Sequence, residues 1–256
     1  ANGIARIRCT TSHPKDLSDE LIECFGALPK LCKHLHLPVQ CGSDRILRAM
    51  NRGYTRERYL EVVDRLRRVC PEIRLTTDII VGFPGENDAD FAETMSLLEE
   101  VRFAELYSFI FSPRKGTAAA DLEDETPAEV KQVRFDRMLA MQQDISREIW
   151  QEDVGKVLEV LVEGESRMGE GQIFGRTTWN RIGRWRRSPR CASGCRRIRR
   201  ARCTRRWPGR NPQMHSHNRN RCRCWTGCGP RPDRAGCHRR PAWRSVCRSR
   251  YATMPN

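Results

Sequence analysis

The clearest feature of the hydrophobic pattern is an apolar run, LTTDIIV, that begins at Leu75 and breaks into the loop GFPGE. A short apolar run bounded by turn-forming residues is typical of a strand buried on both faces, as in a parallel sheet covered by helices. Residues 88–101 then show helical spacing, and their early acidic residues suit the positive end of the helix dipole. The segment therefore predicts a strand, a glycine loop and a helix. Such a loop could approach a ligand closely, although the same glycines would also suit a tight turn.

The same alternation of strands and helices recurs along residues 1–150. Strands are predicted over residues 4–9, 35–40, 75–81 and 105–111, and helices over residues 18–28, 55–69, 88–101 and 127–150, with a further helix from about residue 45. Alternation at this spacing indicates parallel strands joined by right-handed crossovers. Because a closed (β/α) barrel needs about eight strands, we predict an α/β fold in which residues 1–150 form a partial barrel.

The pattern changes after the long helix. Residues 151–182 alternate between apolar and polar positions and contain a glycine-rich turn, which predicts antiparallel strands over residues 157–163 and 172–176. We interpret residues 151–182 as the opening of a small antiparallel β-barrel domain that the following residues do not complete.

Composition divides the chain near residue 183. The whole chain has a formal charge of +15, but residues 1–182 contain 25 Lys and Arg against 31 Asp and Glu, a net charge of −6. Residues 183–256 contain 22 arginines, no lysine and one acidic residue, a net charge of +21, together with eight of the thirteen cysteines. Since this segment also lacks leucine and phenylalanine, it cannot build an ordinary core, and we predict that it is disordered.

Three interpretations of residues 183–256 are open. A basic arm would make the chain a non-catalytic RNA-binding protein, although such arms seldom exclude lysine. A metal module could use Cys222, Cys224 and Cys228, but their CxCxxxC spacing lacks a second half. We favour translation outside the natural reading frame of GC-rich DNA, which enriches arginine, alanine, glycine, proline, cysteine and tryptophan.

Two further features restrict the class of protein. No apolar run approaches the ~18 residues of a membrane helix, so we expect no membrane partner. The five cysteines before residue 183 are scattered without paired spacing, which favours reduced thiols over disulfides. We therefore expect a cytoplasmic protein.

Three motifs carry a resemblance to a known enzyme family: HLPVQCGSDRILRAMNRGYT, DIIVGFPGE and YSFIFSPRKGTAAA. Through them, residues 1–182 resemble the radical S-adenosylmethionine tRNA methylthiotransferases. The branch that makes 2-methylthio-isopentenyladenosine is the most similar, and the threonylcarbamoyladenosine and ribosomal-protein branches are the alternatives. The resemblance implies a tRNA substrate, an electron donor such as a flavodoxin or ferredoxin, a monomer, and a TRAM-like β domain over residues 151–182 that grips the tRNA.

The resemblance also implies two cofactors, S-adenosylmethionine and 4Fe-4S clusters. In the family a CxxxCxxC loop holds the barrel cluster, and this spacing occurs nowhere in the chain. Cys191 and Cys195 give CxxxC, but Ile198 stands at the third ligand position. The family's preceding domain, which carries a second cluster, also has no counterpart in this sequence. We therefore predict no catalytic residue and no metal ligand, and no activity for the chain alone.

By resemblance, S-adenosylmethionine would lie at the carboxyl ends of the strands. The predicted contacts fall in two motifs, PVQCGSD and VGFPGE, and are Gln40, Ser43, Asp44, Gly82, Phe83, Gly85 and Glu86. The first three could bind the ribose or the amino acid part, and the others could present backbone to the adenine or the methionine. An equally good interpretation is that Ser43 or Asp44 caps the helix that begins near residue 45. Cys41 replaces the serine expected in this motif and is not predicted as a ligand.

Arginine and lysine side chains are the candidates for contacts with tRNA phosphates. They lie in the last barrel loop and in the β segment, and are Arg114, Lys115, Arg167, Arg176 and Arg181. Ordinary solvated charge is the alternative for each, and the acidic body argues against RNA binding by bulk charge. Phe174 and Trp179 could stack on bases. We expect His34 and His36 to point to opposite faces of their strand and not to form a metal pair.

Overall fold

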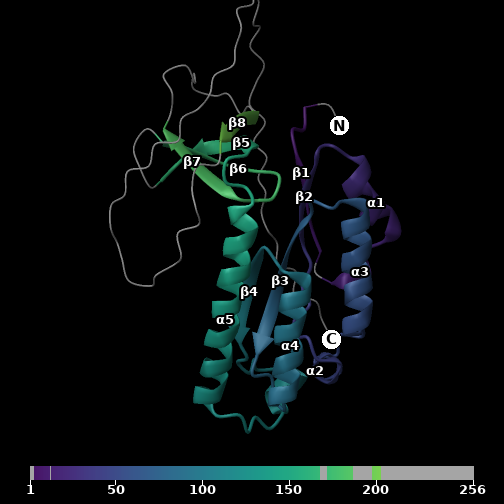
Figure 1. The fold of residues 1–256 in the computed structure, drawn as a ribbon. Coiled ribbons are helices and arrows are strands. Elements are labelled where there is room, and N and C mark those ends of the chain that lie inside the picture. Colours follow the sequence, from purple (N-terminus) through teal and green to yellow (C-terminus); the bar gives the residue numbers. More distant parts are fainter. Residues whose placement is uncertain (1–2, 12, 168–171, 187–197, 203–256) are drawn as a thin grey trace, which may run out of the picture. The chain divides into compact units, whose positions relative to one another are not determined.

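The computed structural model describes residues 3–11, 13–167, 172–186 and 198–202 (Figure 1). All of them belong to one compact unit, Ala1–Trp225, whereas a second unit, Thr226–Asn256, lies outside the described residues. Within the described part of the chain, no helix is long and apolar enough to cross a membrane. The described unit consists of a parallel sheet with its helices, followed by an antiparallel sheet.

Four strands form a parallel sheet whose spatial order, β1-β2-β3-β4, follows the order of the chain. The strands are β1 (Ile7–Thr10), β2 (Leu31–His36), β3 (Arg74–Val81) and β4 (Glu105–Ile110). The helices are α1 (Asp19–Ala27), α2 (Asp44–Ala49), α3 (Arg56–Val69), α4 (Asp88–Val101) and α5 (Ala128–Gln151), with short 3-10 segments at Pro14–Asp16 and Ala118–Asp121. The predicted α/β fold with parallel strands is therefore confirmed.

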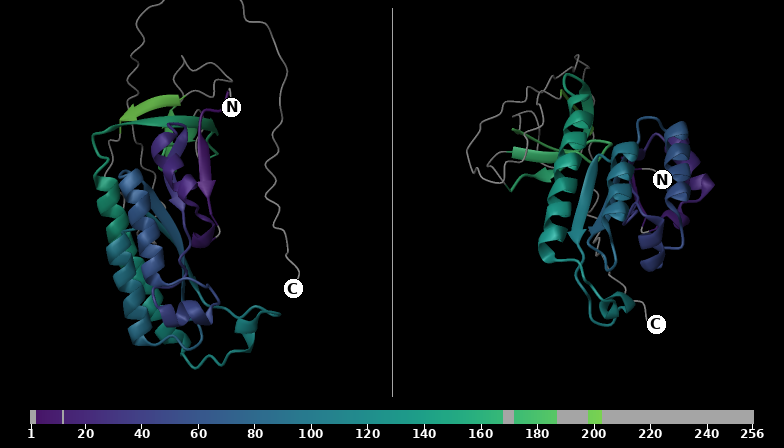
Figure 2. Two further views of the ribbon diagram at one scale, coloured as in Figure 1. Left: turned by 90° about the vertical axis from the view of Figure 1, so that its right-hand side faces the viewer. Right: turned by 60° about the horizontal axis from the view of Figure 1, so that its bottom comes forward.

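Helices α3, α4 and α5 pack on one face of the parallel sheet (Figure 2). Alternation along β3 directs Leu75, Ile79 and Val81 toward the helices, where they are buried in the main hydrophobic core. The opposite face is more polar, and on β4 it leaves Tyr107 and Phe109 exposed. Among the described residues, one face of the sheet is thus core, while the other is open at Tyr107 and Phe109 and buries His34, Arg74 and Thr76 nearer its amino end.

The second strand is present, but its predicted bounds were wrong. We predicted residues 35–40, whereas β2 ends at His36, because Pro38 has no backbone N–H to donate to a ladder. The chain still runs beside β3 after this point, since the Gln40 N–H donates to the Asp78 carbonyl at 2.9 Å. Gln40 has a φ of 72°, and this left-handed backbone turns the chain toward α2.

The second sheet is antiparallel, with the order β7-β6-β5-β8. Its strands are β5 (Val157–Glu165), β6 (Gln172–Arg176), β7 (Ile182–Arg186) and β8 (Ile198–Arg202). The predicted antiparallel extension is confirmed, while its assignment as a TRAM-like domain stays a prediction. Strands β7 and β8 correct our expectation that the whole of residues 183–256 is disordered, because strand pairing uses backbone groups that composition does not report. The metal-module interpretation rests on Cys222, Cys224 and Cys228, which lie outside the described residues.

The turn between β6 and β7 contacts the amino ends of the parallel strands. The Lys33 N–H donates to Thr178 Oγ1 at 2.9 Å, and Trp179 Nε1 donates to the Glu72 carbonyl at 3.0 Å. Arg6 adds a bond from Nη2 to the Glu159 carbonyl at 3.0 Å. The antiparallel sheet is therefore attached at the amino edge of the parallel sheet, opposite the glycine loop (Figure 1).

Candidate functional site at the carboxyl edge of the sheet

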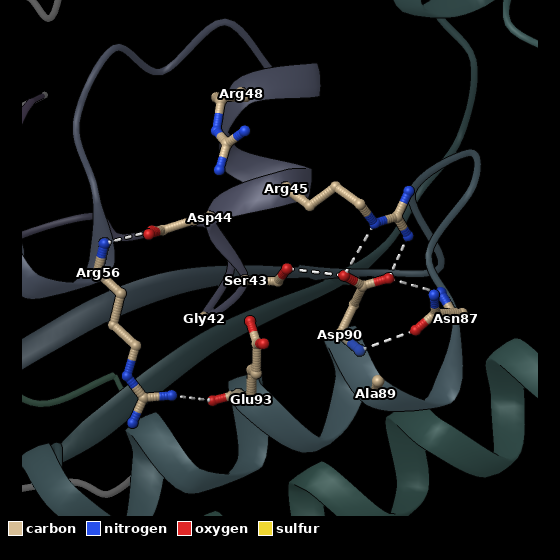
Figure 3. Close-up of a pocket in the computed structure, with 10 residues that line it drawn as sticks. All are labelled: Gly42, Ser43, Asp44, Arg45, Arg48, Arg56, Asn87, Ala89, Asp90 and Glu93. Carbon is tan, nitrogen blue, oxygen red and sulfur yellow. Dashed lines mark hydrogen bonds and ion pairs between the residues drawn. The ribbon is translucent and has the colours of Figure 1, made fainter.

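Two loops meet at the carboxyl edge of the parallel sheet, one after β2 and one after β3, and Asp90 joins them (Figure 3). Ser43 Oγ donates to Asp90 Oδ1 at 2.7 Å, and Arg45 Nε donates to the same oxygen at 3.2 Å. Arg45 Nη2 donates to Asp90 Oδ2 and, at 2.6 Å, to the Gly85 carbonyl. The structure thus brings the two predicted motifs together around a carboxylate that we had not singled out.

Asp90 also closes the amino end of α4. The Asn87 N–H donates to Asp90 Oδ2 at 2.9 Å, and the Asp90 N–H donates to Asn87 Oδ1 at 3.0 Å, which is a reciprocal capping box. Burial acts to raise the pKa of Asp90, but hydrogen bonds from Arg45, Asn87 and Ser43 outweigh it and hold the pKa below its usual value. Asp90 is therefore a fixed anion, and the spacing of Asn87 and Asp90 was the sequence signal that could have revealed it.

A polar pocket opens beside this carboxylate. It has a volume of about 580 Å³ and is lined by Gly42, Ser43, Asp44, Arg45, Arg48, Arg56, Asn87, Ala89, Asp90 and Glu93 (Figure 3). Cationic and anionic side chains are both present, and several are already paired, as Arg56 is with Glu100 at 2.9 Å. Apart from Gly42 and Ala89 its lining residues are polar or charged, so the pocket could accept a small polar molecule that carries both signs of charge.

Neither predicted cap of α2 is made. Ser43 occupies the N-cap position of α2, but its hydroxyl is directed to Asp90 and makes no capping hydrogen bond. Asp44 accepts from the Arg56 N–H at 2.6 Å and so caps the first turn of α3. Both side chains therefore connect neighbouring elements, and a role in holding S-adenosylmethionine stays a prediction for both.

Glu86 is the buried acid of the glycine loop. Its Oε2 accepts from the Gly82 N–H at 2.7 Å and lies 3.4 Å from Arg134 Nη1. Burial raises the pKa of Glu86, and the Gly82 bond and the Arg134 charge oppose that rise. Within the described part of the chain, Glu86 Oε1 and Arg134 Nε are buried without a hydrogen-bond partner. These two atoms could form hydrogen bonds to a polar ligand at the carboxyl edge.

The glycines of this loop are explained by the protein's own packing. Gly82 has a φ of +72°, and a Cβ there would lie 2.6 Å from the Cγ and Cδ atoms of Lys131. Phe83 is buried and packs edge-on against Phe111, with ring centroids 5.1 Å apart. The tight-turn interpretation therefore accounts for this loop without a ligand, and backbone contacts from Gly82, Phe83 and Gly85 to a cofactor stay predictions.

Cysteine chemistry does not fit a cluster in this part of the chain. Among the described residues, no three His, Cys, Asp or Glu side chains lie close enough to hold a metal ion. Cys41 is buried against Thr94, with 3.4 Å between Sγ and Oγ1, and burial raises its pKa to about 11. A thiol that resists ionisation is a poor ligand for iron.

His34 and His36 share a face of β2, so our expectation that they point apart was wrong. Side chains repeat every two residues along a strand, and residues 34 and 36 must therefore lie on the same side. Both rings approach Thr76 Oγ1, at 3.4 Å from His34 and 3.0 Å from His36. His36 also lies 3.4 Å from Asp78 and edge-on to Tyr107 on the open face.

The five candidate tRNA contacts do not form one surface. Arg114 and Lys115 are exposed beyond β4 at the carboxyl edge, and Arg167 is exposed in the turn after β5. Arg176 pairs with Glu163 at 3.0 Å, and Arg181 lies over the Trp150 ring at 5.0 Å. Internal contacts thus already use Arg176 and Arg181.

A cluster that the sequence did not reveal fastens the two sheets together, and we call it the arginine clamp: Arg74, Trp150, Asp153 and Trp179. Arg74 donates two hydrogen bonds to Asp153, at 2.7 and 2.8 Å. Its guanidinium lies between the rings of Trp150 and Trp179, 4.3 and 4.2 Å from their centroids. Trp179 is therefore stacked on an arginine, where we had expected a nucleobase. No local spacing could have predicted this, because the ion pair joins residues 79 positions apart.

The chain is similar in sequence to known proteins. Residues 1–98 match the family described as the radical SAM superfamily. The tRNA-2-methylthio-N(6)-dimethylallyladenosine synthase of Syntrophotalea carbinolica is 67% identical over 181 residues, which cover 71% of this chain and 41% of that protein. The synthase of the same name from Geotalea uraniireducens is 56% identical over 180 residues, covering 70% of this chain and 41% of that protein.

The chain therefore spans about two fifths of the length of these curated relatives. Among solved structures, coproporphyrinogen III oxidase from Escherichia coli, described as a radical SAM enzyme, aligns with a TM-score of 0.47 and 14% identity. That alignment covers 72% of this chain and 46% of the other.

Proposed function

We propose that the chain belongs to the radical SAM tRNA methylthiotransferase family and is part of an enzyme that adds a methylthio group to isopentenyladenosine beside the anticodon of tRNA. The observation that supports this most strongly is the 67% identity over 181 residues with a synthase named for that product. The threonylcarbamoyladenosine and ribosomal-protein branches are the alternatives within the family.

We propose that the two loops of the carboxyl edge hold S-adenosylmethionine. The residues proposed for this are Gln40, Ser43, Asp44, Gly82, Phe83, Gly85 and Glu86. Two of these residues would be held in place for this role, because Ser43 donates to Asp90 and Arg45 donates to the Gly85 carbonyl. S-adenosylmethionine and a 4Fe-4S cluster would supply the radical and the methyl group, which side chains cannot provide.

The cluster does not fit the residues described here, so the chain alone is proposed to be inactive. The arrangement of the described cysteines is the reason, since Cys9, Cys24, Cys32, Cys41 and Cys70 are scattered and form no ligand group. Catalysis would require cluster ligands from outside this sequence.

The proposed partners follow from the same family. tRNA phosphates would meet Arg114, Lys115 and Arg167, which are exposed. A flavodoxin or ferredoxin would supply electrons, and the enzyme would act as a cytoplasmic monomer.

A chimera tests the proposal directly. The 181 aligned residues of this chain would replace their counterparts in the Syntrophotalea carbinolica synthase, and bulk tRNA would be analysed by nucleoside mass spectrometry in a strain that lacks the native enzyme. We expect 2-methylthio-isopentenyladenosine to accumulate as it does with the parent synthase. A chimera that folds and binds its clusters but leaves isopentenyladenosine unmodified would contradict the proposal.

A second candidate function is non-catalytic RNA binding through residues 183–256, and their net charge of +21 favours it. RNA affinity would then fall steeply with salt, because it depends on released counterions. Removing residues 183–256 should abolish RNA binding if these residues are the whole binding site. If residues 1–182 also contact RNA, the binding that persists at high salt should remain after the removal.

A further inference from the structure

Helix α5 contributes a buried arginine to the glycine loop that follows β3, residues 82–86. The Arg134 side chain is 9% exposed, and its Nη1 donates to the Glu86 carbonyl at 3.0 Å and lies 3.4 Å from Glu86 Oε2. Its Nη2 donates to Asp88 Oδ1 at 2.7 Å, in the first turn of α4. One guanidinium therefore joins α5 to the end of the loop and to the start of α4.

The loop is closed through Glu86. The Gly82 N–H donates to Glu86 Oε2 at 2.7 Å, and the Glu86 N–H donates to the Phe83 carbonyl at 2.9 Å. Gly82 and Gly85 have positive φ values of 72° and 79°, and glycine has little intrinsic preference between such a backbone and its alternatives. The glycines permit the closed turn, and the Glu86 carboxylate is the group that fixes it.

The titratable groups around Glu86 come from three elements. They are Asp88 and Asp90 on α4, Lys131 and Arg134 on α5, and Cys41 in the loop after β2. Burial raises the pKa of Glu86 and the charge of Asp90 acts in the same direction, while the Gly82 bond and Arg134 oppose them. The Lys131 ammonium is held by Asp124, and burial raises the pKa of Cys41 to about 11, so this thiol is neutral. Among the described residues, Arg134 is therefore the cation in contact with Glu86.

Stability alone does not explain this buried pair. Among the residues that the structure describes, Glu86 Oε1 and Arg134 Nε are buried and have no hydrogen-bond partner. An ion pair that leaves such atoms unsatisfied regains little of the free energy needed to remove both charges from water, and apolar residues of similar size often stabilise a core as well. What the pair adds over apolar residues is a fixed direction for the Glu86 carboxylate.

We propose that Arg134 is a positioning residue: it keeps the Glu86 carboxylate ionised and directed at Gly82, and so holds the glycine loop in the closed conformation that a ligand at the carboxyl edge meets. Arg134 acts through Glu86 and Gly82. Lysine could supply the charge, but its single ammonium lacks the planar fork that reaches both Glu86 and Asp88. The inference rests on the proposed function only for the identity of the ligand as S-adenosylmethionine.

The Gly82 amide reports the state of the loop directly in an NMR pH titration. The complete chain would be produced with ¹⁵N-labelled glycine, which limits its spectrum to the 18 glycines, and Gly82→Ala would identify the Gly82 signal by its loss. This signal should shift as Glu86 takes up a proton, because the N–H then donates to a neutral group. We expect the midpoint of the shift to rise by about 1–3 pH units in Arg134→Met and by a smaller amount in Arg134→Lys.

Calorimetry with S-adenosylhomocysteine tests whether the loop conformation matters to a ligand. At a pH below the midpoint of Arg134→Met and above that of the unchanged chain, we expect the variant to bind about 3- to 30-fold more weakly. At a pH above both midpoints, Glu86 is ionised in both proteins, and the affinities should agree within about twofold. Arg137→Met is the matched control, because Arg137 is exposed on the same helix, and it should change neither the midpoint nor the affinity.

An unchanged Gly82 midpoint in Arg134→Met would overturn the positioning role, and so would an unchanged midpoint in Arg134→Lys if the first variant does not fold. A loss of affinity that is equal at both pH values would also overturn it, because a purely structural role predicts equal losses. If no protein binds S-adenosylhomocysteine although the Gly82 midpoints shift as expected, the positioning role stands and the proposed cofactor is wrong. The methylthio content of tRNA in the chimera judges the proposed function separately.

Discussion

His34 is the histidine whose surroundings should make stability depend on pH. Burial lowers its pKa from 6.5 to about 4, and the charges of Arg8 and His36 act in the same direction. The unfolded chain binds a proton near pH 6.5, whereas the folded chain does so only near pH 4. Stability is therefore complete above pH 6.5 and falls as the pH drops toward 4, by up to about 3 kcal/mol.

Urea unfolding of the unchanged chain and His34→Gln at several pH values checks this. Glutamine cannot titrate, yet it can hydrogen-bond to Thr76 as His34 does. As the pH falls from 6.5 to 4, we expect the free energy of unfolding to decrease less for the variant than for the unchanged chain. Parallel pH curves for the two proteins would show that burial of His34 is not coupled to folding.

Gly82 should tolerate substitution less well than a glycine of similar backbone. Gly82→Ala must place a Cβ against the Lys131 stem, whose ammonium is held by Asp124. Gly116 has a φ of +86° with nothing within 4 Å, so Gly116→Ala carries only the backbone cost, about 1 kcal/mol. We expect Gly82→Ala to lower the free energy of unfolding by about 1 kcal/mol more than Gly116→Ala does. Equal losses in thermal or urea unfolding would refute the steric explanation.

At the scale of elements, the sequence pattern predicted those helices and strands whose bounds are set by neighbouring residues. Strand β3 and helices α3 and α4 lie within one residue of their predicted bounds, because apolar spacing and caps such as Thr55 and Asn87 are written in adjacent residues. Strand β2 was displaced because the apolar residues around Pro38 continue past the end of its ladder. The pairing of β7 and β8 was missed because it is made by backbone hydrogen bonds, which an arginine-rich composition does not indicate.

In the candidate site, too, the sequence predicted local motifs but not contacts between residues far apart in the chain. The motifs around Ser43 and Gly82 were located by sequence, and the structure does bring them to one edge. Asp90 was missed as the residue that joins them, although its capping-box spacing was visible. The arginine clamp could not be predicted, because its partners come from β3, the end of α5 and the β6–β7 turn.

The arginine clamp should determine how firmly the antiparallel sheet is attached. Arg74→Ala would remove the bidentate partner of the fully buried Asp153 and leave it only the longer contacts to Lys156 and Arg181, at 3.8 and 3.9 Å, so we expect a cost of about 3 kcal/mol. Arg74→Lys keeps the charge but loses the planar fork and both ring contacts, so an intermediate loss is expected. Hydrogen exchange should show faster exchange in β6 and smaller changes in β3.

Arg147→Ala is the matched control for the clamp. Arg147 forms an exposed ion pair with Asp144 on α5, and its loss should cost about 0.5 kcal/mol or less. An Arg74→Ala protein that unfolds like Arg147→Ala, with unchanged exchange in β6, would show that the clamp does not hold the sheet.

At the scale of the whole molecule, the chain should not assemble an iron–sulfur cluster. CxxxCxxC is absent from the sequence, and the described cysteines do not converge. After anaerobic reconstitution with iron and sulfide, followed by desalting, we expect no stoichiometric iron, whereas an established 4Fe-4S protein treated in parallel should retain it. Stoichiometric iron that survives a chelator wash would contradict this expectation.

The order of the parallel sheet has a consequence for how the protein is made. Each strand from β2 to β4 pairs with the one synthesised before it, so the sheet can grow while the chain leaves the ribosome. Arg74, however, must wait for Asp153, 79 residues later, before the arginine clamp can close. Until then, the amino ends of the parallel strands lack their contacts with the β6–β7 turn. Chaperone binding or aggregation should therefore be concentrated between the synthesis of β4 and that of the β6–β7 turn.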